Sequence, residues 1–501
     1  MKNPKFILIY SPQVFDPKFG AIKPEGSLGL IYLASSLRNE NFEVTLLDAA
    51  VGNDNYSLSE TFYKEEVQDN GMIRIGMTLN DIKKEVEGFD AIGITSIFTA
   101  QTRMVEDVIK SIKTEFPEKL IILGGVNARY QMQRFFDSGA DLICLSEAEK
   151  TIVEIGKVLR NGSKDFTKIQ GLAGRNGFFN QQKDIIQNLD SLPIPAWDLQ
   201  PLKKYWEIAR PHGGGFDNQK VAYAPVMFSR GCPFRCHYCH ISKEVNGSDS
   251  GEIGSLRLKS EDRVNIEIEI LQNLGVEYVF IEDDSLLAKK KRALNIFDKL
   301  AEKNLRLADV NGINLAHLCT YKDGKLGVDD ELLESMANAG FQKLSFPVES
   351  GSQRIIDKYA TGKLNLKKHD VSALIRKAKE LNMEIGGAYT FGYPDESISE
   401  MISTFNIARQ HMAAGMDYAN FVIITPFPGT MLYDMALSEN LFIKNLDVAD
   451  MDWMRPTIKT KVPHWFIRLI ITKGWRYVNN ESRINRIKNL SPKTKSKKII
   501  N

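Results

Sequence analysis

The chain has 501 residues, which at about 100 to 200 residues per domain predicts two or three domains. Hydrophobic residues make up 43% and charged residues 26%, values that exclude disordered, collagen-like and disulfide-framework proteins. No apolar run approaches the roughly 18 residues of a membrane helix, and the apolar run at the start is too short for a signal peptide. We therefore expect a cytoplasmic location.

The formal net charge of +2 hides an uneven distribution of charge. Residues 456–501 hold twelve Lys and Arg residues and one acidic residue, Glu481, so this tail carries +11 and the rest of the chain −9. We expect the tail either to pack on the preceding domain as a helix or to lie as an amphipathic helix on an anionic membrane surface. No nucleic-acid-binding module is visible, and no nucleic-acid partner is expected.

Residues 1–160 alternate between short apolar runs and segments with helical spacing, such as 26–39. The strands expected here cover residues 6–10, 42–48, 91–95, 120–125 and 141–145. Runs that are apolar on both faces and separated by helices are typical of a parallel sheet covered on both sides. The predicted fold class is therefore α/β, and residues 1–160 are expected to form a Rossmann-like, doubly wound domain.

The carboxyl ends of these strands carry small and polar residues. In open parallel sheets a ligand binds outside these strand ends. The candidate ligand-binding residues are therefore Ser11, Pro12, Ser96, Gly124, Gly125 and Glu147. The alternative for Gly124 and Gly125 is a tight turn without a ligand. Because no G-x-G-x-x-G motif follows the first strand, a dinucleotide is not expected.

A Gly-, Asn- and Pro-rich segment, residues 161–224, is interpreted as a linker. A second alternating series occupies residues 225–435, and its expected strands cover residues 226–229, 278–282, 308–313, 343–348, 385–391 and 421–425. Six strand–helix units predict a partial parallel barrel, whose active site lies at the strand carboxyl ends. Residues 436–501 are expected to form a basic helical extension.

Three of the five cysteines lie within eight residues, directly after the first expected barrel strand. Cys232, Cys236 and Cys239 have the spacing C-x3-C-x2-C, and three thiolates can hold one iron–sulfur cubane while one iron stays without a protein ligand. The alternative is a zinc site with His237 or His240 as the fourth ligand, although the paired spacings of zinc sites are absent.

This cysteine motif after the first strand of a partial barrel resembles the radical S-adenosylmethionine (radical SAM) enzymes. The resemblance implies that the three cysteines hold a four-iron four-sulfur cluster and that S-adenosylmethionine chelates the open iron. It also implies cofactor contacts by Tyr238, Glu282, Asp283, Glu349, Ser350 and Gly392. The turn after Gly392 departs from the family pattern, because Asp395 stands where glycine is usual. No individual catalytic side chain is predicted.

The N-terminal domain, the joining segment 189–197 and the segment 425–430 together resemble the cobalamin-binding branch of that family. The resemblance implies that cobalamin lies between the two domains. All seven histidines lie at or after His212, so the N-terminal domain offers cobalt no imidazole. Relatives often read G-E-G-E where this chain has Ser-Glu-Ala-Glu at 146–149, and the two added Cβ atoms are expected to crowd the corrin.

The resemblance implies a cobalamin-dependent radical SAM enzyme, most directly a methyltransferase that acts on an unactivated carbon through a 5′-deoxyadenosyl radical. A radical oxidoreductase or cyclase on the same scaffold is the alternative enzyme. A non-catalytic cobalamin or iron–sulfur binding protein is the alternative outside enzymes. The expected partners are a small-molecule or lipid substrate and an external electron donor such as flavodoxin or ferredoxin.

Overall fold

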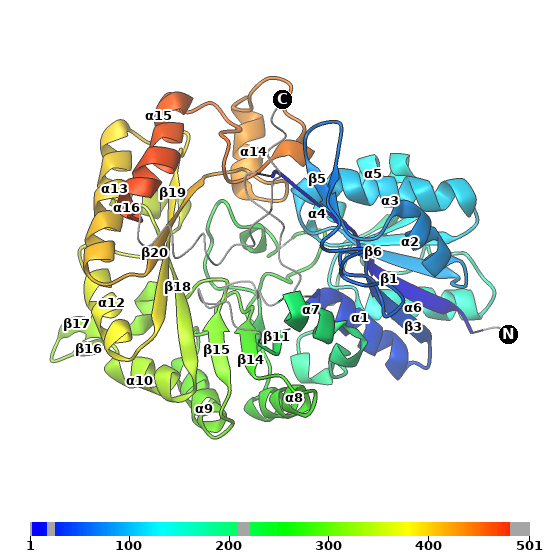
Figure 1. Cartoon of the computed structure of the whole chain (residues 1–501), viewed down its shortest axis with the longest axis horizontal. Coiled ribbons are helices and arrows are strands. Elements are labelled where there is room, and N and C mark those ends of the chain that lie inside the picture. The colour runs from blue at the N-terminus through cyan, green and yellow to red at the C-terminus, as the bar shows by residue number, and fades with distance from the viewer. Residues whose placement is uncertain (1–2, 18–25, 209–220, 246, 481–501) are drawn as a thin grey trace.

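The computed structural model describes residues 3–17, 26–208, 221–245 and 247–480. Two α/β lobes lie side by side, the N-terminal lobe in blue and cyan and the C-terminal lobe in green to gold (Figure 1). The predicted architecture of a Rossmann-like domain followed by a partial barrel is confirmed. His212 and residues 481–501 of the basic tail lie outside the described residues.

The first sheet has seven strands in the order β10-β9-β8-β7-β6-β1-β3. Its parallel strands are β1 (Lys5–Tyr10), β3 (Glu43–Asp48), β6 (Ala91–Thr95), β7 (Leu120–Gly124) and β8 (Leu142–Cys144). Both faces are covered because alternate side chains point to opposite sides, Phe6 and Leu8 into one core and Ile7 and Ile9 into the other.

Helices of the N-terminal lobe pack on both faces of this sheet. One face carries α1 (Leu28–Asn39) and α6 (Glu149–Arg160), and the other carries α2 (Leu79–Val86), α3 (Thr102–Glu115) and α5 (Met132–Ser138). The shorter elements of the lobe are β2 (Gln13–Phe15), β4 (Glu66–Val67), β5 (Ile73–Ile75), η1 (Thr99–Gln101) and α4 (Val126–Tyr130).

The segment interpreted as a linker, 161–224, contains short elements that pack on the two lobes. Its elements are β9 (Leu172–Gly174), β10 (Phe179–Asn180), η2 (Leu189–Ser191), η3 (Trp197–Leu199) and α7 (Leu202–Ile208), and β9 and β10 extend the first sheet with antiparallel pairing. Trp197 is buried, and its indole N–H donates to Pro225 O at 3.2 Å. The buried Tyr205 hydroxyl donates to Asp48 Oδ2 at 2.7 Å. These two aromatic anchors tie the segment to both lobes, which its Gly- and Pro-rich composition did not indicate.

The second sheet has six parallel strands in the order β11-β14-β15-β18-β19-β20. They are β11 (Tyr223–Val226), β14 (Tyr278–Ile281), β15 (Arg306–Asp309), β18 (Phe341–Glu349), β19 (Glu384–Phe391) and β20 (Tyr418–Ile423). The helices outside this sheet are α8 (Glu261–Asn273), α9 (Lys290–Ala301), α10 (Asp330–Asn338), α11 (Gln353–Tyr359), α12 (Val371–Glu380) and α13 (Ile398–Ala413) (Figure 1). The shorter elements are η4 (His240–Ser242), η5 (Leu315–Leu318), β16 (Cys319–Lys322) and β17 (Lys325–Val328).

The first barrel strand ends earlier than the predicted range 226–229. β11 ends at Val226, and the backbone N–H of Phe228 donates to Asp283 Oδ1 at 2.6 Å instead of to a neighbouring strand. The hairpin that follows pairs β12 (Ser229–Arg230) with β13 (Arg257–Leu258). Asp283 follows β14, so the carboxylate that ends the strand comes from a distant part of the sequence.

An interdomain ion-pair network joins the two lobes beside this hairpin. Glu147, just beyond β8, accepts from both terminal nitrogens of Arg257 at 2.7 and 2.8 Å. Glu149, at the start of α6, pairs with Arg230 at 2.7 Å. Arg230 and Arg257 lie opposite each other in the hairpin, where like charges repel. The hairpin therefore depends on two carboxylates from the other lobe.

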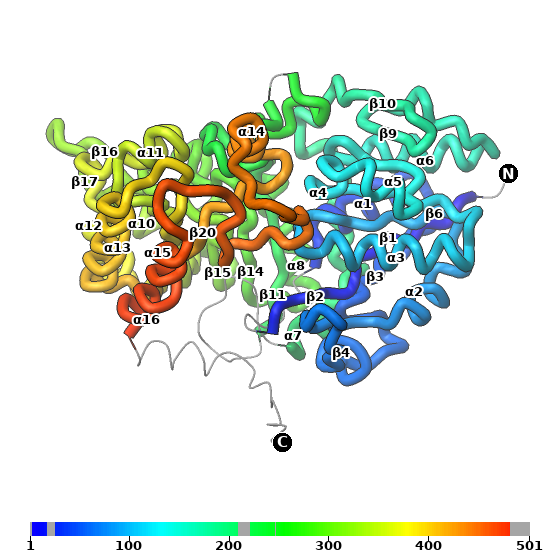
Figure 2. Tube along the Cα trace, turned by 90° about the horizontal axis from the view of Figure 1, so that it is seen from above, coloured from blue at the N-terminus to red at the C-terminus, as the bar shows by residue number. Residues whose placement is uncertain are grey.

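The C-terminal segment returns from the barrel to the N-terminal lobe (Figure 2). Its elements are α14 (Met431–Ser438), η6 (Val448–Asp450), α15 (His464–Leu469), the π-helical turn η7 (Ile470–Gly474) and α16 (Trp475–Val478). Asp447 pairs with Arg103 and Arg134 of the N-terminal lobe at 2.8 and 2.7 Å. Within the described ranges, no helix combines the length and the apolar character needed to cross a membrane.

Replacing Glu147 with Gln is expected to destabilise the contact between the lobes. Arg257 would stay buried without a compensating charge, which costs about 3–5 kcal/mol. Thermal unfolding of the full chain should show a lower midpoint for this variant. The control Glu154→Gln removes an exposed pair with Lys157 on α6 and should leave the midpoint near that of the wild type. Equal midpoints for the two variants would contradict a structural role for Glu147.

Candidate functional site

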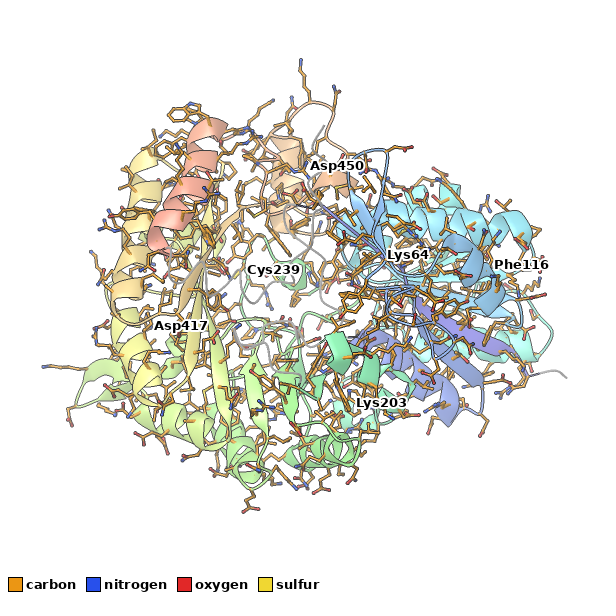
Figure 3. All side chains as sticks on the ribbon, viewed as in Figure 1. Lys64, Phe116, Lys203, Cys239, Asp417 and Asp450 are labelled. Carbon is orange, nitrogen blue, oxygen red and sulfur yellow. The ribbon has the colours of Figure 1, made fainter. Side chains whose placement is uncertain are left out.

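The three cysteines lie in the loop that follows β12, and Figure 3 places Cys239 between the two lobes. The backbone N–H of Cys232 donates to Gly254 O at 3.0 Å, which holds the start of the loop. Gly231 has a φ of +80°, and a Cβ at this position would lie 2.3 Å from Ser255 O. The turn into the cysteine loop therefore requires glycine.

The thiols of Cys232, Cys236 and Cys239 are close enough to act on one another electrostatically, and burial raises the pKa of each. Among the described residues, no three His, Cys, Asp or Glu side chains converge as the ligands of a single metal ion do. A cubane binds its three thiolates to three different irons and does not need them to converge. The donor set therefore fits an iron–sulfur cluster, and the zinc alternative finds no support.

The loop 359–363, which contains no recognisable motif, docks against the cysteine loop. The backbone N–H of His237 donates to Tyr359 O at 2.8 Å, and that of Arg235 donates to Thr361 Oγ1 at 3.2 Å. Thr361 has a φ of +38°, which is a strained conformation for a β-branched residue. The strain is concentrated where this loop holds the cysteines.

Lys363 ends the docking loop and is a candidate functional residue that the sequence did not predict. Its Nζ lies 3.5 Å from Glu349 Oε1, with both side chains largely buried. Burial lowers the pKa of Lys363, but Glu349 and the three thiols outweigh that effect and raise it. Glu349 itself has a φ of +68°, and its other oxygen accepts from Thr390 Oγ1 at 2.9 Å. Lys363 is thus a fixed cation beside the cysteine loop.

The contacts of Asp395 explain why this chain has an aspartate where the family usually has glycine. It accepts from the Tyr359 hydroxyl at 2.7 Å, and it pairs with Arg354 and Lys358 at 2.7 and 2.9 Å. Burial raises the pKa of Asp395, but Lys358, Tyr359 and Arg354 outweigh it and lower the pKa to about 2. The carboxylate therefore anchors the start of the docking loop, a role that glycine could not fill.

Two of the predicted cofactor residues use their polar side chains inside the protein, and a third forms a turn. Asp283 holds the Phe228 N–H, as described for the end of β11. The Ser350 hydroxyl is buried and lies 3.2 Å from Thr404 Oγ1. Gly392 has a φ of +86°, which a turn requires. These residues shape the strand ends, and their contact with S-adenosylmethionine stays a prediction.

Tyr238 directly precedes Cys239, and Glu282 directly follows β14. Burial raises the pKa of Glu282 to about 8, and the neighbouring Asp284 and Asp283 add to the shift. Burial also raises the pKa of the Tyr238 hydroxyl far above its usual value, and Glu349 adds to it. At neutral pH both side chains therefore hold a proton and are able to donate a hydrogen bond.

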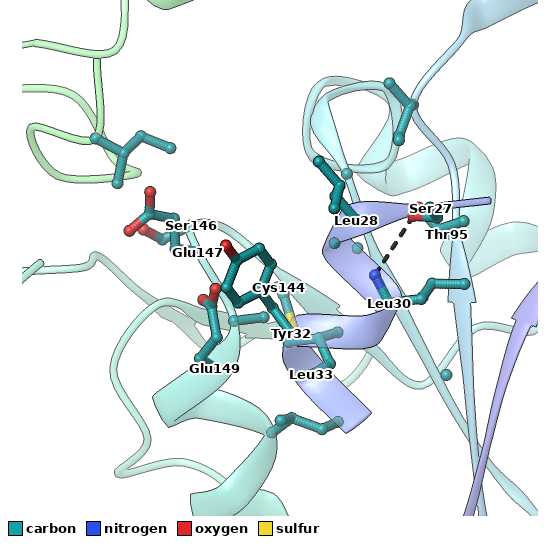
Figure 4. A pocket seen from close by; sticks show the side chains of 18 of the residues that line it. Ser27, Leu28, Leu30, Tyr32, Leu33, Thr95, Cys144, Ser146, Glu147 and Glu149 are labelled. Atoms are coloured by element: carbon teal, nitrogen blue, oxygen red, sulfur yellow. Dashed lines mark hydrogen bonds between the residues drawn. The ribbon is translucent and has the colours of Figure 1, made fainter. Parts of the chain in front are cut away.

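A cavity of about 370 Å³ lies between the lobes, at the carboxyl ends of the first sheet. Figure 4 shows Tyr32 beside Glu147 and Glu149 on one side of it, with Ser27, Leu28 and Thr95 on the other. The barrel contributes Met227, Arg230, Gly231, His240, Ile241 and Asp284. Of the residues predicted to bind a ligand, Gly124, Gly125 and Glu147 line the cavity, whereas Ser11, Pro12 and Ser96 are not among its lining.

Two glycines that line the cavity, Gly29 and Gly124, leave its surface bare, although the surrounding packing does not require a glycine at either position. A Cβ added at Gly124 would meet no atom closer than 4.0 Å, and one at Gly29 none closer than 3.7 Å. Gly125 differs, because its φ is +104° and an added Cβ would lie 2.4 Å from Ser96 O. The tight-turn interpretation therefore applies to Gly125, while the bare surface over Gly29 and Gly124 fits a broad flat ligand such as a corrin.

The barrel side brings one imidazole to this cavity. His240 follows Cys239 directly and is among the described lining residues. Burial lowers the pKa of His240 to about 4, and Arg129 adds to the shift. Ser146 and Ala148, which were expected to crowd a corrin, also line the cavity, and the Ser146 hydroxyl is turned toward the barrel, where it donates to Ser250 O at 2.6 Å.

Replacing Lys363 with Met should shift the midpoint potential of the reconstituted cluster to a more negative value. Reduction adds an electron, and a nearby cation stabilises the added negative charge. Lys363→Arg keeps the charge and should remain near the wild type, as should the exposed control Lys367→Met. A redox titration followed by electron paramagnetic resonance measures the potential. An unchanged potential in Lys363→Met at full iron content would rule out this electrostatic role.

Replacing Gly124 with Ala should weaken cobalamin binding about tenfold, because the added methyl group occupies the cavity floor. The unfolding midpoint should not change, since no protein atom lies within contact of that methyl group. The control Gly88→Ala adds the same group at an exposed site with no neighbour within 4 Å. Absorbance titration with hydroxocobalamin gives the affinities. Wild-type affinity in Gly124→Ala would place the corrin elsewhere.

Comparisons with known proteins agree with the two-lobe division. Residues 226–408 match the radical SAM superfamily, and residues 24–156 match the B12 binding domain. An uncharacterized methyltransferase of Pyrococcus horikoshii is 27% identical over 91% of this chain and 87% of its own length. The cytidylyl-2-hydroxyethylphosphonate methyltransferase of Streptomyces wedmorensis is 27% identical over 81% of this chain and 76% of its own length.

A solved structure shares the fold of both lobes. The radical S-adenosylmethionine methyltransferase TsrM from Kitasatospora setae superposes with a TM-score of 0.66, at 15% identity, over 96% of this chain and 90% of its own. The two matched domains give this chain its cofactors, which are a four-iron four-sulfur cluster, S-adenosylmethionine and cobalamin. The chain therefore joins a B12 binding domain to a radical SAM domain, the combination expected from its resemblance to the cobalamin-binding branch of the radical SAM enzymes.

Proposed function

We propose that this protein is a cobalamin-dependent radical SAM methyltransferase that acts on an unactivated carbon of a small molecule. The observation that carries the proposal is that residues flanking the three cysteines line the cavity between the lobes. Arg230 and Gly231, just before Cys232, and His240, just after Cys239, line the interdomain cavity. A substrate between the lobes is therefore able to reach both sites at once.

Different residues of the chain would hold the two cofactors. Cys232, Cys236 and Cys239 would ligate the cluster, while Gly29 and Gly124 leave room for the corrin. When bound, the cluster supplies the electron that generates a 5′-deoxyadenosyl radical from S-adenosylmethionine, and cobalamin supplies a methyl group. Chemistry of this kind requires that water be kept away from the reacting groups.

Glu349 and Lys363 are proposed to position S-adenosylmethionine. Their opposite charges lie 3.5 Å apart beside the thiols, which suits a ligand that carries both an amino and a carboxylate group. Tyr238 and the protonated Glu282 supply further hydrogen-bond donors in the same region.

The partners in this proposal are a small-molecule substrate and a one-electron donor such as flavodoxin or ferredoxin. A reducing compartment such as the cytoplasm suits the three free thiols before the cluster is assembled. A radical cyclase remains the second candidate, because anaerobic magnesium-protoporphyrin IX monomethyl ester cyclase of Synechocystis is 22% identical over 92% of this chain and 83% of its own length.

The test uses the full chain reconstituted anaerobically with iron, sulfide and cobalamin. With a strong reductant and S-adenosylmethionine we expect 5′-deoxyadenosine, and from the reduced cobalamin-loaded protein we expect a single turnover of S-adenosylhomocysteine. Cys236→Ala should lose the cluster and 5′-deoxyadenosine but retain cobalamin, because the corrin floor belongs to the other lobe.

The possible outcomes separate the candidate functions. 5′-Deoxyadenosine without any S-adenosylhomocysteine would favour the cyclase. An intact cluster that yields neither product would favour a non-catalytic binding protein. Loss of cobalamin together with the cluster in Cys236→Ala would contradict the division into two cofactor sites.

A further inference from the structure

The surface formed by α13 and the helical segment 464–478 serves no purpose in the cofactor sites. The two helical elements run side by side along the outside of the barrel (Figures 1 and 2). The rings of Phe405 and Tyr477 lie 6.1 Å apart, and the Arg409 guanidinium lies 5.3 Å from the Tyr477 ring. The exposed residues that we call the basic-aromatic face are Ile398, Ile402, Arg409, Trp465, Arg468, Leu469, Lys473, Arg476 and Tyr477.

This face exposes large apolar side chains although its helices have a separate buried side. Ile467, Ile470 and Ile471 are buried and anchor the segment on the barrel. Exposed fractions on the outer side are 67% for Trp465, 65% for Tyr477, 46% for Ile398, 44% for Ile402 and 39% for Leu469. A group of exposed apolar side chains on one surface marks an interaction site more often than scattered single residues do.

The charged residues of the basic-aromatic face are all cations. Its four cations are exposed, and the residues of α13 and of 464–478 include one carboxylate, Glu400, which Arg354 binds at 2.8 Å. The chain before residue 456 carries a net charge of −9, so the cations are concentrated here against an acidic background. Residues 481–501 follow this segment directly and add seven Lys and Arg residues.

We propose that the basic-aromatic face binds the surface of an anionic lipid bilayer. Cations that alternate with Trp, Tyr and aliphatic side chains are the composition of helices that lie in the membrane interface. The cations attract anionic headgroups, and the apolar side chains enter the headgroup boundary. This inference goes beyond the methyl-transfer reaction and does not depend on it, because the exposed residues of the face are not among the residues assigned to the cofactors.

The test measures co-sedimentation of the full chain with vesicles of phosphatidylcholine alone and with vesicles that contain phosphatidylglycerol. We expect binding to the anionic vesicles only, and weaker binding at high salt. The double variant Arg468→Gln and Lys473→Gln should lower the partition coefficient about 30-fold, since each cation near the surface contributes about 1 kcal/mol. The matched control Lys64→Gln and Lys110→Gln makes the same change of charge at exposed sites of the N-terminal lobe.

Each outcome decides the proposal. An equal loss in both double variants would mean that net charge, and not this face, drives binding. A loss confined to a third pair, Lys497→Gln and Lys498→Gln, would assign binding to the tail alone. Wild-type vesicle binding by the face variant, together with impaired reduction of its cluster by flavodoxin, would identify an acidic protein as the occupant and overturn the proposal. Unfolding midpoints and iron content exclude a folding defect.

Discussion

The site depends on the repulsion between two arginines that lie opposite each other in one hairpin. Arg230 and Arg257 face each other across β12 and β13, and Glu147 and Glu149 of the other lobe offset their repulsion. Arg230 stands two residues before Cys232 and also packs on the Tyr32 ring at 4.6 Å. One buried network therefore fixes the contact between the lobes, one wall of the cavity and the start of the cysteine loop. Such a network adds specificity of docking more than stability.

Local patterns account for what the sequence predicted correctly. The expected strand 91–95 coincides with β6, because an apolar run is a local signal. The strand expected at 226–229 was misplaced because Asp283 takes the Phe228 N–H. Asp283 lies 55 residues away in the sequence, so no local pattern near residue 228 indicates this contact. The anchoring of Trp197 and Tyr205 was missed for the same reason.

For the candidate site too, the sequence predicted what depends on local patterns and missed what depends on distant contacts. The cysteine spacing is local, and the sequence identified all three thiols. Glu147 was predicted as a ligand because it follows a strand, but its partner Arg257 lies 110 residues away. Lys363 was not predicted because its place beside the thiols results from the docking loop and not from a motif. Gly124 and Gly125 look equivalent in sequence, yet only Gly125 is required by backbone geometry.

The contact between the lobes also controls the charge of the site. Asp284 acts electrostatically on the thiols of Cys232 and Cys239, and Glu282 stands two residues before it. Burial raises the pKa values of Glu282 and Asp284 to about 8 and about 7. In the unfolded chain these carboxyls ionise near pH 4, so the folded state holds the additional protons and loses stability as the pH rises from about 4 to about 8. The site therefore avoids an excess of negative charge by retaining protons, with Lys363 as the fixed cation.

Water that entered between the lobes would solvate these carboxylates, lower their pKa values and release those protons. A low water content in this region therefore favours the protonated forms of these acids, and the ion pairs at Glu147 and Glu149 hold the lobes together beside it.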